Sequence, residues 1–174
     1  MLDTLITSKT RLRLLLKFFT NSKSSAYLRG LADEFGESTN AIRLELNNLS
    51  KAGLLTYAEN GRTVEYKANT THPLYNEISS IVHKYLGLDK IVEQIVHKLG
   101  KVQEAYLVGD YAKGLDSGTI ELLIVGEIDK EYLQKLISKA KTIVKRNIKA
   151  KVICESEKEQ SLQHNGHYML LWKE

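Results

Sequence analysis

The 174-residue sequence has one cysteine, one proline and no long hydrophobic run. Cys154 can form neither an internal disulfide nor a multi-cysteine metal site, and we expect it to lie in the core of a strand. No apolar run approaches the ~18 residues that cross a bilayer, and the first residues lack the basic-then-apolar order of a signal peptide. The sequence therefore predicts a cytoplasmic protein that does not enter a membrane.

The sequence also lacks any stretch rich in glycine, serine and proline that would form a flexible linker. Its length permits one large domain or two small ones. The formal net charge is +4, and residues 1–87 hold 11 Lys+Arg against 8 Asp+Glu, while residues 88–174 hold 14 against 13. The more basic first half permits contact with nucleic acid, although many solvated surfaces have a similar balance.

Apolar residues in the first half recur at helical spacing and predict helices. These helices cover Lys9–Phe19, Tyr27–Phe35 and about 38–52. Ser8 and Ser38 stand where an N-cap is needed, since a serine hydroxyl accepts a hydrogen bond from the first turn. Gly53 follows the third helix, as glycine commonly does just past a helix C-terminus.

The spacing of Ala32, Gly36 and Ile42 predicts a helix-turn-helix. A small residue is needed where the second and third helices approach, glycine permits the sharp turn, and an aliphatic residue holds the third helix in the core. Such a third helix enters the major groove of DNA. Two β-prone runs, Leu54–Ala58 and Thr63–Ala68, flank Asn-Gly and predict a hairpin, which would be the wing.

If Ile42, Leu46 and Leu49 form the buried stripe of the third helix, its opposite face carries residue types that read base edges. The predicted readers are Thr39, Asn40, Arg43 and Asn47. Ser38 suits a phosphate, because it lies at a helix N-terminus, and Arg62 at the hairpin tip would meet the minor groove or the backbone. The predicted phosphate contacts are Lys23, Arg29, Lys51 and Lys67. Winged helices also serve as protein-interaction modules, which is the alternative.

Residues 4–86 resemble an ArsR-type winged helix. The resemblance rests on Thr10 to Leu16, Tyr27 to Ala32, Asn40 to Leu46, Lys51 to Leu55, Asn69 and His72-Pro73-Leu74. Metal-sensing members of that class use cysteine and histidine ligands, and the predicted recognition helix has neither. The histidines are scattered along the sequence, so we expect no metal and no cofactor.

The second half predicts a small α/β domain, because strands alternate with a helix. The predicted strands are Val102–Val108, Thr119–Val125, Ala150–Cys154 and His167–Trp172, and the predicted helix is Lys130–Asn147. Pro73 opens a helix that Gly87 interrupts, so we place the boundary at Gly87. The expected fold class is α+β, with a winged helix-turn-helix in 1–87 and an α/β domain in 88–174.

The stretches Leu107–Gly114 and Gly118–Gly126 resemble the nucleotidyltransferase signature. That family holds phosphates with a Gly-Ser pair, and holds metal ions with two aspartates on one strand and a third acid on a later strand. Here Asp110 replaces the serine, Thr119 the first aspartate and Glu121 the second. The later strand places lysines where an acid is expected, and Asp116 lies in a loop.

We therefore expect no catalytic residues and no enzymatic activity. The whole chain resembles prokaryotic regulators in which a winged helix precedes a degenerate nucleotidyltransferase-like domain, a pseudoenzyme. The alternative is an active metal-dependent nucleotidyltransferase that uses the winged helix for targeting.

The predicted function is sequence-specific transcriptional regulation, with double-stranded DNA as partner and a homodimer formed through the helices of residues 73–99. The second domain has three open roles: dimerisation, docking of another protein, or binding of a small-molecule or nucleotide effector. The predicted ligand loop consists of Gly109, Asp110, Lys113, Gly114 and Glu121. We expect a solvated face for the basic helix residues Lys135, Lys139, Lys141, Lys145 and Arg146.

Overall fold

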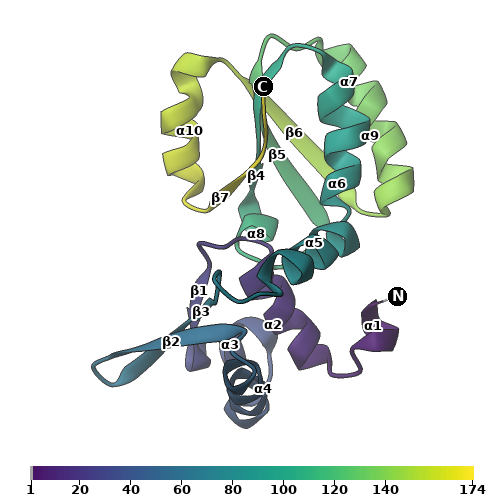
Figure 1. The fold of residues 1–174 in the computed structure, drawn as a ribbon. Coiled ribbons are helices and arrows are strands. Elements are labelled where there is room, and N and C mark those ends of the chain that lie inside the picture. Colours follow the sequence, from purple (N-terminus) through teal and green to yellow (C-terminus); the bar gives the residue numbers. More distant parts are fainter. Residues whose placement is uncertain (1) are drawn as a thin grey trace. The chain divides into compact units, whose positions relative to one another are not determined.

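The computed structural model describes residues 2–174, which form two compact units, one ending at Val82 and the other covering His83–Glu174. The division falls inside helix α5 (Tyr75–Leu86), whereas the boundary expected from the sequence, Gly87, directly follows that helix. Within the described residues the strands form sheets β1-β3-β2 and β6-β5-β4-β7, and helices accompany both (Figure 1). The α+β class is therefore confirmed. No helix among these residues is long and apolar enough to cross a membrane.

The first unit, residues 2–82, contains the predicted helices. They are α2 (Lys9–Phe19), α3 (Leu28–Phe35) and α4 (Thr39–Lys51), preceded by a short α1 (Leu2–Leu5) that the sequence did not predict. Ser8 accepts a hydrogen bond from the backbone N–H of Arg11, and Ser38 accepts one from that of Ala41. Both predicted N-caps are confirmed, and each satisfies a donor that the first helical turn leaves without an intrahelical partner.

The turn between α3 and α4 has the predicted helix-turn-helix geometry. Gly36 ends α3 in the left-handed region at φ +64°, which glycine adopts without steric cost. Ala32 is buried where the helices approach, and Ile42 is fully buried at the start of α4. Fully buried side chains from several elements fill this core: Leu14, Phe18, Phe19, Leu31, Ile42 and Leu46. Because this core holds one side of α4, the opposite side of the helix faces solvent.

Ion pairs tie α2 to the rest of the helix-turn-helix. They are Arg11–Glu45 at 2.9 Å, Lys17–Glu34 at 2.7 Å and Arg13–Glu37 at 3.0 Å. Burial raises the pKa of Glu45, but hydrogen bonds from Ser8 and Arg11 outweigh this effect and leave the pKa lowered. Glu45 is therefore ionised on the inner side of α4, where it fixes that helix against α2.

The wing is the antiparallel hairpin of β2 (Leu55–Asn60) and β3 (Thr63–Ala68), in which Asn60 pairs with Thr63 and Tyr57 with Tyr66. The predicted hairpin is thus confirmed. A further strand, β1 (Ser25–Tyr27), pairs with the other edge of β3. The sequence placed a loop here and began the next helix at Tyr27, because a three-residue strand is too short to show alternation.

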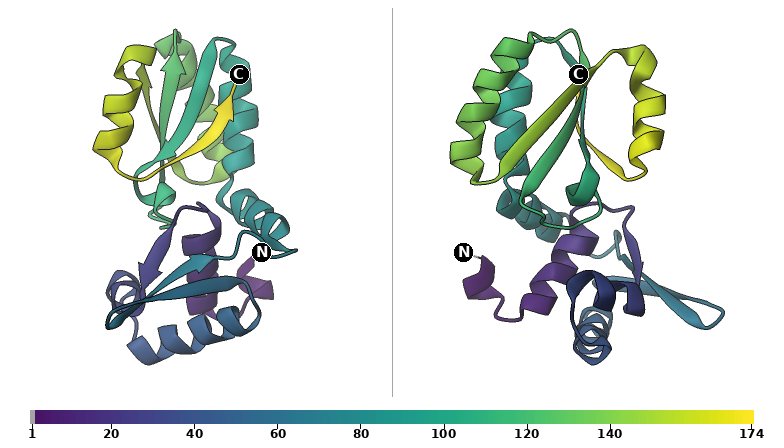
Figure 2. Two further views of the ribbon diagram at one scale, coloured as in Figure 1. Left: turned by 60° about the vertical axis from the view of Figure 1, so that its left-hand side comes forward. Right: turned by 180° about the vertical axis from the view of Figure 1, so that it is seen from behind.

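The second unit is a mixed sheet with helices on both faces. Its strands are β4 (Val102–Val108), β5 (Thr119–Gly126), β6 (Asn147–Ile153) and β7 (Tyr168–Lys173). One face is covered by α6 (Leu88–Ile91), the π-helical turn η1 (Val92–Val96), α7 (His97–Leu99) and α9 (Lys130–Val144), and the other by α10 (Lys158–Asn165) (Figures 1 and 2). β5 and β6 are parallel and joined through α9, whereas β4 pairs antiparallel with β5 and β7.

Some features of this unit differ from the sequence predictions. Helix α9 ends at Val144 rather than Asn147, since Lys145 takes a left-handed conformation at φ 56°. β6 begins at Asn147 rather than Ala150, because Ile148 is buried beside its strand partner Ile120. The expectation for Cys154 was wrong: it is exposed, because the chain turns just after β6.

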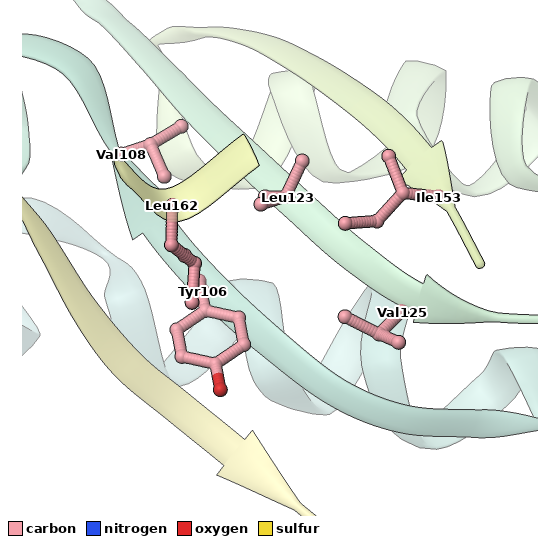
Figure 3. Packing of buried hydrophobic residues seen from close by; sticks show 6 residues of the cluster. All are labelled: Tyr106, Val108, Leu123, Val125, Ile153 and Leu162. Atoms are coloured by element: carbon pink, nitrogen blue, oxygen red, sulfur yellow. The ribbon is translucent and has the colours of Figure 1, made fainter. Parts of the chain in front are cut away.

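Helix α10, which the sequence did not predict, packs on the sheet through Leu162. Leu162 contacts a cluster formed by Tyr106, Val108, Leu123, Val125 and Ile153 (Figure 3). Within α10, all of whose residues are described, Leu162 is the single buried side chain. A single apolar contact gives no helical periodicity, which is why the sequence pattern did not indicate this helix.

The buried carboxylate of Glu104 joins β4 to α10 and β7. It accepts hydrogen bonds from Tyr106 Oη at 2.6 Å, and its oxygens lie 2.7 Å from Lys158 Nζ and 3.1 Å from Lys173 Nζ. The hydrogen bonds from Lys158 and Tyr106 lower the pKa of Glu104 to about 2. Burial, together with the hydrogen bond to Glu104, raises the pKa of Tyr106 to about 12. Glu104 is therefore ionised although it is buried.

Candidate nucleic-acid interface

The outer face of α4 carries the predicted base-reading residues. Thr39, Asn40, Arg43 and Asn47 are all exposed, and Ser38 is exposed at the N-terminus of the same helix. Arg43 Nη1 donates a hydrogen bond to Asn40 Oδ1 at 3.1 Å. The structure thus brings these side chains onto one surface, and it pairs the arginine with an asparagine one turn earlier.

Leu44 lies on this same outer face, and sequence reasoning missed it. It is 62% exposed, whereas Leu46 and Leu49 of the same helix are buried. Leu44 is four residues after Asn40 and three before Asn47, so the three side chains share one helix face. The available signal was its position outside the buried stripe. An exposed aliphatic side chain on such a face suits the methyl group of thymine.

A groove of about 450 Å³ runs between α4 and the wing. Its lining residues are Asn47, Ser50, Lys51, Tyr57, Val64 and Tyr66. The rings of Tyr57 and Tyr66 lie 6.0 Å apart, and Tyr57 is 62% exposed. Lysine and tyrosine both donate hydrogen bonds to phosphate oxygens. The structure therefore brings Lys51 together with the wing, and it adds two tyrosines that the sequence analysis did not select.

The other predicted phosphate contacts lie apart from this groove. Arg62 is exposed at the tip of the hairpin, Lys23 is exposed between α2 and β1, and Arg29 is exposed on α3. Lys67 forms an ion pair with Glu65 at 3.2 Å. Because side chains alternate along a strand, Lys67 lies on the opposite face of the sheet from Tyr66. The structure does not bring Lys67 to the groove.

In the second unit, the predicted ligand loop forms the short helix α8 (Gly109–Ala112) and the turn that follows it. Gly109 has φ +69°, and a Cβ at this position would collide with the carboxylate of Glu121. Glycine therefore allows the Glu121 carboxylate to lie against the start of α8. Asp110 and Lys113 form an ion pair at 3.8 Å, so their charges offset one another. Gly114 follows them with φ +79°.

Asp116 is held by Arg146 and Tyr111. Arg146 Nη2 lies 2.7 Å from Asp116 Oδ2, Arg146 Nε donates to Tyr111 Oη at 2.8 Å, and Tyr111 Oη also hydrogen-bonds to Asp116. Burial raises the pKa of Asp116, but the hydrogen bonds from Arg146 and Tyr111 outweigh it and lower the pKa. Asp116 is thus committed to an ion pair. The solvated-face expectation for Arg146 was wrong, because its side chain is only 16% exposed and binds Asp116 and Tyr111.

The strand that would supply a third acid presents lysines instead. In the parallel register, Glu121 of β5 is opposite Lys149 of β6, and Leu123 is opposite Lys151. Thr119, at the position of the first aspartate of the signature, is opposite Asn147. Across residues 2–174, no group of three or more His, Cys, Asp or Glu side chains has an arrangement that could hold a metal ion.

No protein-family model matches this sequence, and no curated protein matches it. Several solved structures are similar. Reduced HlyU from Vibrio cholerae is 19% identical, with 48% of this chain and 82% of that chain covered and a TM-score of 0.38. NolR from Sinorhizobium fredii is 19% identical, with coverage of 49% and 81% and a TM-score of 0.38. The Shewanella oneidensis HEPN toxin in complex with MNT antitoxin is 17% identical, with coverage of 51% and 71% and a TM-score of 0.38.

Proposed function

We propose that this chain is a transcriptional regulator of the ArsR-like winged-helix kind, which binds specific double-stranded DNA through α4 and its wing. The observation that carries the proposal is the outer face of α4, where Asn40, Arg43, Leu44 and Asn47 are exposed together. Placed in the major groove, Arg43 would pair with guanine and the asparagines with adenine. The exposed cap Ser38 would meet a phosphate, and Arg62 on the wing would meet the minor groove or the backbone.

Selection of bound fragments from a random or genomic DNA library tests this function directly. We expect enrichment of one sequence pattern and an affinity that falls steeply with salt, because lysine and arginine contacts to phosphates release counterions. The measurement is a binding isotherm on the enriched fragment at several salt concentrations. An affinity for DNA that is absent or independent of salt would contradict the proposal and favour a protein-interaction module.

We further propose that the chain binds DNA as a homodimer, since one recognition helix reads only a few base pairs. Large apolar side chains remain exposed on the helical edges of the first unit. They include Leu5 on α1 at 75%, Ile81 on α5 at 50% and Leu74 just before α5 at 55% exposure. A palindromic pattern among the selected fragments, and a molar mass of two chains in light scattering, are the expected results.

For the second unit we propose a non-catalytic role, because Glu121 is the one acid at the three metal-binding positions of the transferase signature. The rival is a metal-dependent nucleotidyltransferase with a winged-helix targeting module. Incubation with labelled nucleoside triphosphates and Mg²⁺ or Mn²⁺ separates the two. Label transfer by the wild type that disappears in Glu121→Gln would overturn the proposal.

The exposed side chain of Leu44 gives a prediction about thymine. Replacing a contacted thymine by deoxyuridine removes one methyl group, and loss of its burial against Leu44 should weaken binding about 4-fold, or ~0.8 kcal/mol. Leu44→Ala should bind thymine and deoxyuridine sites equally well, whereas Leu44→Met should keep the preference for thymine. Gel-shift titrations of the selected site, substituted one thymine at a time, measure this. If Leu44→Ala still bound the thymine site about 4-fold more tightly than the deoxyuridine site, another residue would be contacting the methyl group.

A further inference from the structure

A pocket of about 220 Å³ lies on the face of the second sheet that α10 covers only in part. Leu162 of α10 belongs to the same buried cluster as Val108 and Leu123 (Figure 3). Val108 and Leu123 also line the pocket. The polar part of the lining consists of Glu121, Lys149, Lys151 and Asn165. This pocket differs from the predicted loop, of which it includes only Glu121.

The charged groups of the pocket are not used by the fold. Lys149 and Lys151 are two residues apart on β6, so their side chains leave the same face of the sheet. Although Lys149 is the strand partner of Glu121, neither side chain forms an ion pair or a hydrogen bond within residues 2–174, and the side chain of Lys151 likewise forms none. The Glu121 carboxylate instead lies against Gly109, on the β4 side of its strand.

The charge of Lys151 acts on the carboxylate of Glu157, but Glu157 has its own hydrogen-bond partners. Glu157 Oε2 accepts hydrogen bonds from the backbone N–H and the thiol of Cys154, each at 3.2 Å. These bonds from Cys154 are the main cause of the lowered pKa of Glu157, and the charge of Lys151 contributes less. Two lysines therefore lie beside the pocket without a direct anionic partner, so the lining carries an excess of positive charge.

We propose that this pocket binds a small phosphate monoester without a metal ion. A monoester carries a charge of about −1.5 to −2 and three acceptor oxygens, which suits two ammonium groups. Same-face residues on a strand are roughly 6.7 Å apart at Cα, so Lys149 and Lys151 can approach different oxygens of one tetrahedral phosphate. The positive charge that a metal ion would bring is already present on the side chains.

The remaining groups define the body of the ligand. Asn165 Nδ2 donates to the backbone oxygen of Ser161 at 2.7 Å, so its carbonyl oxygen is left to accept. Glu121 also accepts, and both therefore favour hydroxyl or amino groups on the ligand. The pocket is smaller than the ~300–1,000 Å³ of sites for drug-sized ligands. It suits a sugar phosphate, or a nucleoside monophosphate whose base extends beyond the pocket.

Calorimetric titration of the full chain in EDTA, without DNA, tests this site separately from DNA binding. The probes are AMP, glucose 6-phosphate, inorganic phosphate and adenosine, and their comparison distinguishes a nucleotide from a sugar phosphate. We expect at least one phosphate monoester to bind, and we expect no binding of adenosine, which lacks a phosphate. Lys149→Ala/Lys151→Ala should lose at least about 10-fold in affinity, whereas the control Lys139→Ala/Lys141→Ala, which removes equal charge from the exposed side of α9, should bind as wild type.

Several results would overturn the assignment. They are the absence of binding by every phosphate probe, unchanged affinity in the double variant, or binding that requires Mg²⁺ and is lost in Glu121→Gln. Lys149→Gln/Lys151→Gln is a second variant that keeps most of each side chain. The fluorescence of Trp172 on β7 confirms that the second unit of each variant is folded.

Discussion

Arg43→Ala is expected to weaken binding to the selected DNA site about 5- to 150-fold, or ~1–3 kcal/mol, and to relax the base preference at one position. Arg43 is exposed on α4, and Asn40 Oδ1 accepts its hydrogen bond, which holds the guanidinium at the surface before DNA arrives. A bidentate pair with guanine needs the planar guanidinium. Isotherms on the selected site and on each single-base variant measure the loss.

Two further variants make this test specific. Arg43→Lys keeps the charge but not the fork of donors, so it should retain non-specific binding and lose the preference for guanine. Lys141→Ala removes one positive charge from the second unit and should leave affinity unchanged. If Arg43→Ala instead weakened binding to all sequences equally, Arg43 would be a phosphate contact and the base-reading role of α4 would be wrong.

Glu104→Gln is expected to lower the free energy of unfolding of the second unit by about 2–3 kcal/mol at pH 7. The side chain of Glu104 is only 8% exposed and faces both Lys158 and Lys173, so glutamine removes two ion pairs at once. Urea unfolding followed by Trp172 fluorescence is the measurement, because the first unit contains no tryptophan.

The same variant should show a defined pH dependence. The pKa of Glu104 is lowered from 4.5 to about 2 in the folded state. Its stabilisation is therefore fully present above about pH 4.5, the value of an ordinary glutamate, and is lost as the pH falls toward 2. The difference in unfolding free energy between wild type and Glu104→Gln should therefore disappear as the pH falls over this range.

The control for the acid effect is Glu127→Gln, a change at an exposed glutamate after β5. It should leave both the unfolding free energy and its pH dependence unchanged. A gap between wild type and Glu104→Gln that persists at pH 2 would mean that packing, and not the charge of Glu104, explains the loss.

The winged helix could be predicted because its signals are local. Ser8, Ser38 and Gly36 mark helix ends within a few residues, and Ile42 and Leu46 define the buried side of α4 by spacing alone. β1 and α10 could not be predicted in the same way. β1 is stabilised by pairing with a strand far along the sequence, and α10 by the single contact of Leu162. Such elements depend on tertiary partners that no short window contains.

The candidate sites also contain parts that follow from local sequence and parts that depend on tertiary structure. The polar outer face of α4 follows from the position of its buried stripe, but Leu44 was overlooked because only polar types were considered as readers. The partnership of Asp116 with Arg146, thirty positions apart, has no local signal. The pocket beside Lys149 depends on the parallel register of β5 and β6, which sequence spacing does not reveal.

The pairing of β4 with β7 has a consequence for how the chain is made. β7 is synthesised long after β4, and until it exists one edge of β4 has exposed backbone donors and acceptors, while Glu104 lacks Lys173. An unpaired edge strand readily joins another chain. A ribosome that stalls before β7 would therefore release a product with a folded winged helix and an aggregation-prone second unit, which proteases would degrade first at the incomplete sheet.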